Sequence, residues 1–242
     1  MVRSNKVLNV SGFRVQIIRK KVRNVRLKVG PDGSVSVSAP YLTPESTITA
    51  FVTDKSGWIE KQLERFSSLE REPERMFADG EIHMLFGKAH RLNVVETEGR
   101  QRADFGLEGF ILKVHGGSSI EDRRRLLNNF YRRELKEAVP EIIRRWEPLM
   151  GVRASGFGIR KMKTRWGTCN IHSGKIWINL ELAKRRPELL EYLVVHELCH
   201  LIERSHNSRF KSLMTGFLPD WRERQKELHS FPLVNTDEHS SE

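Results

Sequence analysis

Apolar and polar residues alternate along the first part of the chain. The alternation is clear over residues 13–17 and 25–29, and the sequence GPDG at 30–33 provides a tight turn into a further strand. Residues 43–66 then carry apolar side chains at helical spacing after a Thr-Pro start. Short strand-like segments return over 76–115. The pattern predicts antiparallel strands and one amphipathic helix in this part of the chain.

The second half of the chain begins with a helical period. Ser119 and Asp122 have the spacing of a capping box, and apolar residues recur at helical spacing as far as Trp146. We expect Pro140 to kink or split this helix. Two strand-like segments follow, a long apolar helix begins at Pro187, and two shorter helices separated by a proline close the chain.

Length and cysteine content narrow the class of protein. A chain of 242 residues can bury a full core, and it has only two cysteines, Cys169 and Cys199. Its first residues contain no apolar run of signal-peptide length, and no 18 consecutive residues are apolar. We therefore expect a cytoplasmic protein without a membrane span, in which Cys199 is a small core residue.

The net charge of +11 and the isoelectric point near 9.9 raise the question of a nucleic-acid partner. The Lys and Arg residues are scattered over several segments, and no recognised nucleic-acid fold signature accompanies them. A solvated basic surface is the simplest interpretation, and any contact with nucleic acid would have to come through that surface.

The most informative segment is HELCHLIERSH, which contains His196, Glu197, His200 and His206. Two histidines four residues apart on a helix lie on the same face, so both imidazoles can bind one Zn²⁺ while Glu197 takes a proton from the metal-bound water. Two imidazoles and a carboxylate are costly to bury without a metal or other partners, which argues against an incidental core helix. The motif predicts a zinc hydrolase.

The third ligand is the least certain part of the motif. His206 lies beyond the expected helix end near Arg204 and Ser205, and its separation from His200 equals that of the metzincin pattern. That pattern has a glycine where this chain has Glu203, so the turn must be made differently and Glu203 becomes a rival ligand. We favour His206, because a residue one turn further along the helix axis reaches the metal poorly.

The order of the elements predicts an α+β protein with two parts. Residues 1–117 would form a β-rich N-terminal lobe with one helix, and residues 118–234 a zincin-like metallohydrolase domain that contains the catalytic site. Residues 235–242 have the composition of a disordered tail.

Several separated segments occur in the order found in one known family. The sequence RWGTC at 165–169, the strand KIWINLEL, the run EYLVVHELCHL and the later SHNSRF resemble the YgjP-like family of predicted metal-dependent hydrolases, a group of small zincins described as metallopeptidases. The likeness extends upstream to RNVRLKVGPDGSVSVSAP, GWIEKQL and DGEIHMLFGKAHRL, so it covers most of the chain. It implies that the three histidines are metal ligands and that Glu197 is the catalytic base.

The chain departs from the pattern of that family at a few positions. The family commonly has W-G-S-C-S, N-H-S after the metal helix, and a Trp after the phenylalanine of that segment. None of the departures removes a ligand; they are Thr168, Asn170, Ser205, Asn207 and Lys211.

The expected reaction is hydrolysis of a peptide or protein substrate. Three protein ligands leave the fourth position of zinc for water, whose pKa falls to about 7. Glu197 would accept the proton and pass it to the leaving group. Arg165 and His172 are candidates for the donor that stabilises the oxyanion, against the plainer interpretation that both are surface residues. Cys169 is a weaker candidate for a metal ligand.

Two further residues are candidates for substrate binding. Trp166 and Gly167 are placed to form the edge of a cleft to which an extended peptide adds as a strand, since glycine permits a close backbone approach. The more conservative interpretation makes Trp166 a core aromatic beneath the sheet.

A second function competes with peptide hydrolysis. Some members of the YgjP-like family are described as nucleoside triphosphate pyrophosphatases, and Arg160, Lys161, Lys163 and Arg165 could hold phosphates. This alternative would explain the positive net charge of the chain, because basic side chains bind phosphates. However, the sequence lacks a glycine-rich phosphate loop and the carboxylate clusters that usually hold Mg²⁺. A nucleic-acid binder with a structural zinc is weaker still, because Glu197 would have no role.

Overall fold

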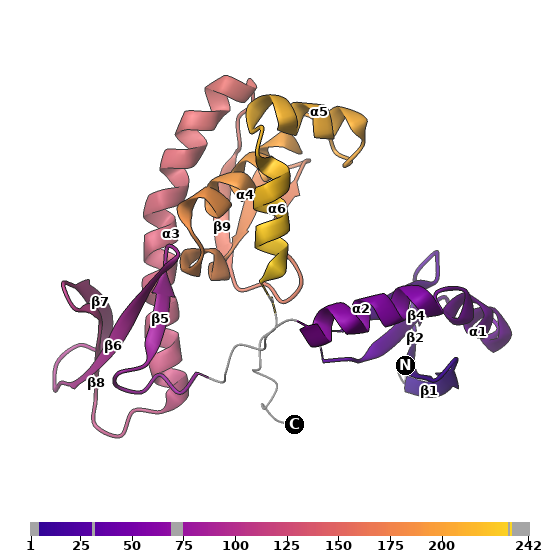
Figure 1. Ribbon diagram of the computed structural model, residues 1–242, viewed down its shortest axis with the longest axis horizontal. Coiled ribbons are helices and arrows are strands. Elements are labelled where there is room, and N and C mark those ends of the chain that lie inside the picture. The colour runs from indigo at the N-terminus through magenta and orange to yellow at the C-terminus, as the bar shows by residue number, and fades with distance from the viewer. Residues whose placement is uncertain (1–4, 31, 69–74, 232, 234–242) are drawn as a thin grey trace. The chain divides into compact units, whose positions relative to one another are not determined.

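The computed structural model describes residues 5–30, 32–68, 75–231 and 233 (Figure 1). The chain divides into two compact units, Met1–Arg71 and Glu72–Glu242. Each unit has its own cluster of buried apolar side chains. The expected disordered tail at 235–242 lies outside the described residues. The α+β class predicted from the sequence is confirmed.

The first unit is a four-stranded sheet followed by two helices. The strand order is β1-β2-β4-β3, with β2 and β4 parallel and the other pairs antiparallel. The elements are β1 (Asn5–Val10), β2 (Phe13–Arg19), β3 (Arg26–Val29), β4 (Val35–Ala39), α1 (Glu45–Asp54) and α2 (Ser56–Ser68).

The sequence pattern predicts one helix where the structure has two. The backbone leaves the helical conformation at Lys55, with φ −101° and ψ 9°, two residues before Gly57. Glycine has a low helix propensity, so this segment resists a break less than its neighbours do. The apolar spacing continues across the break, and Ile48, Val52 and Ile59 are all buried against the sheet.

The second unit starts with another four-stranded sheet, of order β5-β6-β8-β7. Its strands are β5 (Ile82–Leu85), β6 (Lys88–Glu96), β7 (Arg102–Gly106) and β8 (Gly109–Val114). The sheet packs on the long helix α3 (Ile120–Met150) through an aromatic cluster that includes Phe110, Phe130 and Tyr131. The Tyr131 hydroxyl also donates a hydrogen bond to the carbonyl of Met84 at 2.9 Å.

These contacts change the domain division expected from the sequence. The pattern places a boundary after residue 117, whereas the contacts place it after Arg71. The strands over 82–114 share the core of α3, so they belong with the second unit rather than with the N-terminal sheet.

Helix α3 runs without a break through Pro140, so the expected split does not occur. Ser119 caps its start and accepts a hydrogen bond from the Asp122 N–H at 3.1 Å, as the capping-box spacing predicts. Residues buried before and after the proline, such as Val139 and Met150, anchor both parts of the helix. Tertiary packing therefore outweighs the local cost of the missing N–H.

The remaining elements build the layer that carries the candidate site. The first of the two strand-like segments is in fact two strands, and the resulting sheet has the order β10-β11-β9, with β9 parallel to β11. Its inner face contacts helix α4. The elements are β9 (Gly156–Arg160), β10 (Gly167–Asn170), β11 (Lys175–Asn179), the 3-10 helix η1 (Leu180–Lys184), α4 (Pro187–Cys199), α5 (Ser208–Phe217) and α6 (Trp221–Ser230).

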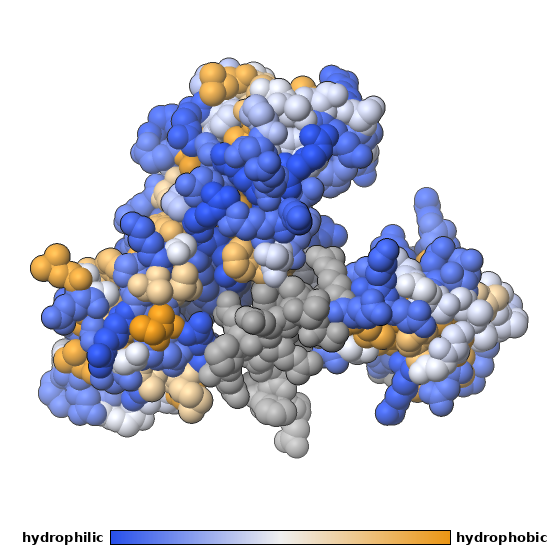
Figure 2. Space-filling view, viewed as in Figure 1, coloured by the Kyte–Doolittle hydropathy of each residue, from blue (hydrophilic) through white to orange (hydrophobic). Residues whose placement is uncertain are grey.

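The surface in view in Figure 2 is hydrophilic over most of both units, with apolar residues scattered over it. Within the described ranges, no helix combines the length and the apolar character that a membrane crossing requires.

Candidate metal centre

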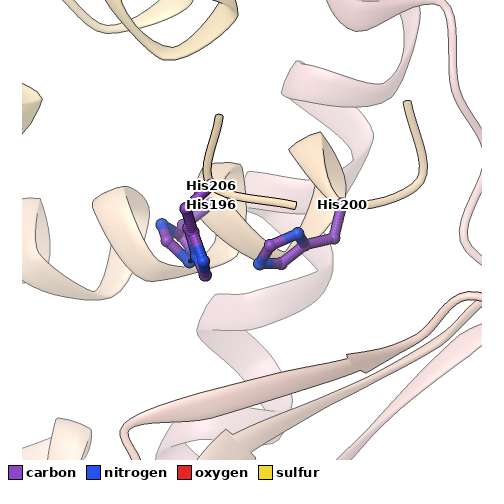
Figure 3. Close-up of side chains that lie close together, drawn as sticks. All are labelled: His196, His200 and His206. Carbon is purple, nitrogen blue, oxygen red and sulfur yellow. Dashed lines mark hydrogen bonds between the residues drawn. The ribbon is translucent and has the colours of Figure 1, made fainter. Parts of the chain in front are cut away.

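The structure brings His196, His200 and His206 together at the C-terminal end of α4 (Figure 3). One ring nitrogen of each lies within 4.8 Å of the others. The Nε2 atoms of His196 and His206 are 3.0 Å apart. Three nitrogens that converge in this way from one helix and the following loop can bind a single ion.

The turn that brings His206 back differs from the one that a glycine would make. Helix α4 ends at Cys199, so Glu203 lies in the following loop and not on a helical stripe. The Glu203 carboxylate accepts a hydrogen bond from the Ser205 N–H at 3.1 Å. Residues 200–206 all keep negative φ. The loop therefore needs no left-handed residue, and Glu203 stabilises the turn while remaining outside the histidine cluster.

The Glu203 backbone also orients one of the histidines. The Nδ1 atom of His200 lies 3.2 Å from the Glu203 carbonyl oxygen. A carbonyl oxygen can only accept a hydrogen bond, so Nδ1 carries the proton. The other ring nitrogen, Nε2, therefore keeps its lone pair, which is available to a metal ion. Metal-binding histidines commonly have such a partner on the other ring nitrogen.

The ring of Phe210 packs against all three imidazoles. It is 1% exposed, and its ring centroid lies 5.0 Å from that of His196 and 4.8 Å from those of His200 and His206. Asn207 caps α5 by accepting a hydrogen bond from the Phe210 N–H at 3.0 Å, which ties Phe210 to the segment that carries His206. The sequence contains Phe210 in SHNSRF, but only the fold shows that it contacts the histidines.

Burial favours the neutral form of His196 and His200, which is the form that binds a metal. It lowers the pKa of His196 to about 3, with further lowering from the neighbouring His200 and His206. Burial also lowers the pKa of His200. The Nδ1 atom of His196 is buried without a hydrogen-bond partner among the described residues. The three imidazoles converge, His196 and His200 favour the neutral form, and the Nδ1 atom of His196 lacks a partner, so the cluster fits a metal ion.

Glu197 lies next to the histidine cluster on the buried side of α4. The residue is 3% exposed, and its Oε2 has no partner within the described part of the chain. Burial raises the pKa of Glu197 to about 8, and the charge of Arg165 opposes that rise. The buried carboxyl is therefore able to exchange a proton near neutral pH.

Gly167 on β10 makes room for the Glu197 carboxylate. A Cβ at Gly167 would lie 2.6 Å from Glu197 Oε1, 3.0 Å from Leu193 Cδ2 and 3.1 Å from the Trp177 carbonyl oxygen. The absence of a side chain at this position lets the strand approach α4 closely.

A cavity of about 660 Å³ opens in front of these groups. Arg165, Gly167 and His172 from the strand side line it, together with Cys169. Trp166, a candidate for substrate binding, lies instead in the core at 6% exposure, 5.8 Å from the guanidinium of Arg185. Cys199 is fully buried in the core, as expected.

Asn179 positions the segment that carries Arg165, and sequence reasoning missed it. It is fully buried, and its Nδ2 donates to the carbonyls of Met162 at 2.8 Å and Arg165 at 2.7 Å. Its Oδ1 accepts from the N–H groups of Met162 at 3.3 Å and Glu181 at 3.2 Å. An asparagine at the end of an apolar strand is the signal in the sequence, but its partners depend on the fold.

A histidine cluster beside a buried carboxyl, in an open cavity of an α+β domain, is the type of site found in metal-dependent hydrolases. A family model described as "YgjP-like, metallopeptidase domain" matches residues 23–231. The chain therefore belongs to the YgjP-like family, as the resemblance in the sequence implies, and the metallopeptidase domain indicates a metal-dependent peptidase.

Solved structures offer a more distant comparison. The chain is similar to the metallopeptidase zymogen jannalysin of Methanocaldococcus jannaschii, with 18% identity and a TM-score of 0.34. The match covers 38% of this chain and 93% of that chain. No curated protein matches the chain.

Proposed function

We propose that the protein is a zinc-dependent metallopeptidase in which His196, His200 and His206 bind the zinc ion and Glu197 is the catalytic base. The observation that carries this proposal is the convergence of three imidazoles next to a buried carboxyl in an open cavity. Membership of a family with a metallopeptidase domain supports the same conclusion.

The donor set favours zinc over the hard cations. Three imidazole nitrogens suit Zn²⁺ and its neighbours among the transition metals, whereas Mg²⁺ and Ca²⁺ prefer oxygen ligands. Catalytic zinc sites typically use three protein ligands and leave one position open. When bound here, zinc would polarise the scissile carbonyl and acidify a water molecule.

Glu197 supplies the proton transfers of the reaction. Its carboxylate would accept a proton from the attacking water and later give it to the leaving amine nitrogen. Gly167 holds the carboxylate in place by allowing the close approach of β10. The raised pKa suits a group that must hold the proton between the two transfers.

The substrate would bind as an additional strand beside β10. In the sheet order β10-β11-β9, β10 is an edge strand, and its Gly167 and Cys169 line the cavity. A peptide that pairs with this edge would pass in front of the histidine cluster. Arg165 and His172 line the cavity, which supports them as candidates for contact with the carbonyl oxygen that develops negative charge.

The four basic side chains that could hold phosphates in the alternative function do not all line the cavity. Of Arg160, Lys161, Lys163 and Arg165, only Arg165 lines it. The guanidinium of Arg160 stacks on the Trp177 ring at 3.3 Å from its centroid. We therefore favour peptide over nucleoside triphosphate hydrolysis.

The test compares wild type with Glu197→Gln and His206→Ala. Mass spectrometry of metals should find zinc in wild type and Glu197→Gln, and loss of zinc in His206→Ala. Cleavage of a peptide library should fall on the order of 10²- to 10⁴-fold in Glu197→Gln. Full zinc retention by His206→Ala would contradict the ligand assignment, and pyrophosphate release from nucleoside triphosphates without peptide cleavage would contradict the substrate class.

A further inference from the structure

The N-terminal sheet has one face that its own helices leave uncovered. Val15 and Ile17 of β2 and Val35 and Val37 of β4 are buried against α1 and α2, so the alternate residues point to the other side. We call this side the open face; its members are Val7, Asn9, Arg14, Gln16, Ile18, Arg26, Lys28, Ser36 and Ser38.

The positive charge of the unit is concentrated on its strands and their connections. Residues 5–44 contain eight Lys and Arg but a single acidic residue, Asp32. Residues 45–71, which include both helices, contain four basic and five acidic residues. The open face itself has three cations and no carboxylate. Lys20, Lys21 and Arg23 follow β2 and are exposed, without a carboxylate nearby in the sequence.

The fold does not use the cations of the open face. Lys6 pairs with Glu45, and Arg19 donates to three backbone carbonyls beside α1, so these two are structural. Among the described residues, Arg14, Arg26 and Lys28 form no ion pair. The pKa of the Asp32 carboxyl is lowered mainly by the hydrogen bond from the Ser34 hydroxyl, and the charge of Lys28 contributes least. Cations without structural partners are available to a ligand.

The other side chains of the open face indicate which polyanion it fits. Asn9, Gln16, Ser36 and Ser38 are the polar types that contact phosphate and sugar oxygens in protein–nucleic acid complexes. The face has no aromatic side chain, so it lacks the stacking platform that holds the bases of single strands. Its two apolar members, Val7 and Ile18, are too few to insert into a lipid surface.

We propose that the open face of the N-terminal sheet binds the phosphate backbone of double-stranded nucleic acid without reading its sequence. Arg14, Arg26 and Lys28 contact phosphates, and the serines and amides between them donate to phosphate and sugar oxygens. This binding surface is separate from the histidine cluster, so it does not depend on the proposed peptidase activity.

The test measures binding of the full chain to a fluorescent 30-base-pair DNA duplex at several salt concentrations. The slope to be measured is that of the logarithm of the association constant against the logarithm of the salt concentration. In the variant Arg14→Gln, Arg26→Gln, Lys28→Gln, the magnitude of this negative slope should decrease by about 2 to 3, because each phosphate contact contributes about 0.9. The control variant Lys61→Gln, Lys88→Gln, Arg100→Gln loses the same charge from other exposed positions and should keep most of the slope.

Two results would overturn the proposal. The first is no duplex binding by wild type at low salt, whether or not the chain binds phosphatidylserine-containing vesicles or polyglutamate. The second is an equal loss of slope in the two variants. Each variant is checked for folding by circular dichroism.

A measurement on the wild-type chain keeps the proposal testable if the triple variant does not fold. Lysines are acetylated with and without the duplex, and modified sites are located by mass spectrometry. Lys28 should be protected by the duplex, whereas Lys61 and Lys88 should not. Equal modification of Lys28 in both samples would contradict the proposal.

Discussion

Gly167 has a function that depends on having no side chain. We predict that Gly167→Ala lowers kcat/KM for peptides on the order of 10²-fold, because the added Cβ would lie 2.6 Å from Glu197 Oε1 and must displace the carboxylate. Zinc content should stay unchanged, since the atoms nearest to the added Cβ belong to Glu197, Leu193 and Trp177 and not to the histidines. Kinetics and metal analysis of the same preparation check both parts.

The matched control for this substitution is Gly57→Ala in α2, where an added Cβ meets no atom within 4 Å. It should leave activity unchanged and stabilise the helix by up to about 1 kcal/mol. A Gly167→Ala enzyme with full activity would show that the carboxylate does not need its present position.

Phe210 packs against all three imidazoles of the cluster. We predict that Phe210→Leu weakens zinc binding roughly 10- to 100-fold, because supporting contacts around a ligand affect affinity to this extent. All three histidine rings stack or pack edge-on against Phe210. Competition with a chelator of known affinity measures the change.

Phe130→Leu is the control for a general loss of packing. Phe130 is 2% exposed and belongs to the same core, but its ring contacts lie with Phe105, Phe110 and Tyr131. The two variants should lose similar stability, while only Phe210→Leu loses zinc affinity. An equal loss of affinity in both would mean that Phe210 acts through global stability.

The sequence alone predicts which residues of the site share a helix. It does not predict the contacts between residues that are far apart in the sequence. His196, Glu197 and His200 are close in sequence, so helix geometry alone predicts their shared location. The contact of Glu197 with Gly167 joins residues thirty positions apart, and it depends on the pairing of β10 with β11. No local pattern contains that information.

At the scale of elements, β11 holds the segment between β9 and β10 through a single side chain. We predict that Asn179→Ala destabilises the second unit by about 2 to 3 kcal/mol, because it leaves partly buried backbone groups of Met162, Arg165 and Glu181 unpaired. The released segment carries Arg165, which lines the cavity, so KM for peptides should rise. The zinc content should change little. Denaturant titration and steady-state kinetics measure the two effects.

Asn93→Ala on β6 provides the comparison for Asn179→Ala. Its Nδ2 makes one bond, to the Phe110 carbonyl at 3.3 Å, in a sheet away from the cavity. This variant should cost about 1 kcal/mol and leave KM unchanged. A KM effect of the same size at both positions would remove the special role of Asn179.

Element boundaries were predictable where local chemistry decides them and not where packing does. Ser119 caps α3 through its own hydroxyl, so the sequence shows the start of this helix. The same helix passes through Pro140 because buried contacts anchor both sides, and a sequence pattern does not contain those contacts. Likewise, β5 to β8 alternate like the N-terminal strands, and only their packing on α3 assigns them to the second unit.

At the scale of the whole molecule, two separate cores should unfold separately. The first unit buries Val15, Ile17 and their neighbours, while the second has a larger core that includes α3 and α4. Calorimetry should therefore resolve two transitions rather than one. All of the proposed zinc ligands lie in the second unit, so metal binding should be linked to that transition alone.

Metal removal tests this linkage directly. A ligand present at about 100 times its dissociation constant stabilises the folded state by about 2.7 kcal/mol, so chelation should lower the midpoint of the second unit by several degrees. Trp58 is the only tryptophan of the first unit, whereas Trp146, Trp166, Trp177 and Trp221 report on the second. Replacing Trp58 by Phe should therefore leave the metal-sensitive fluorescence transition intact, because that signal arises in the second unit. If chelation instead shifts both calorimetric transitions equally, the two units are energetically coupled and the independence of their cores is refuted.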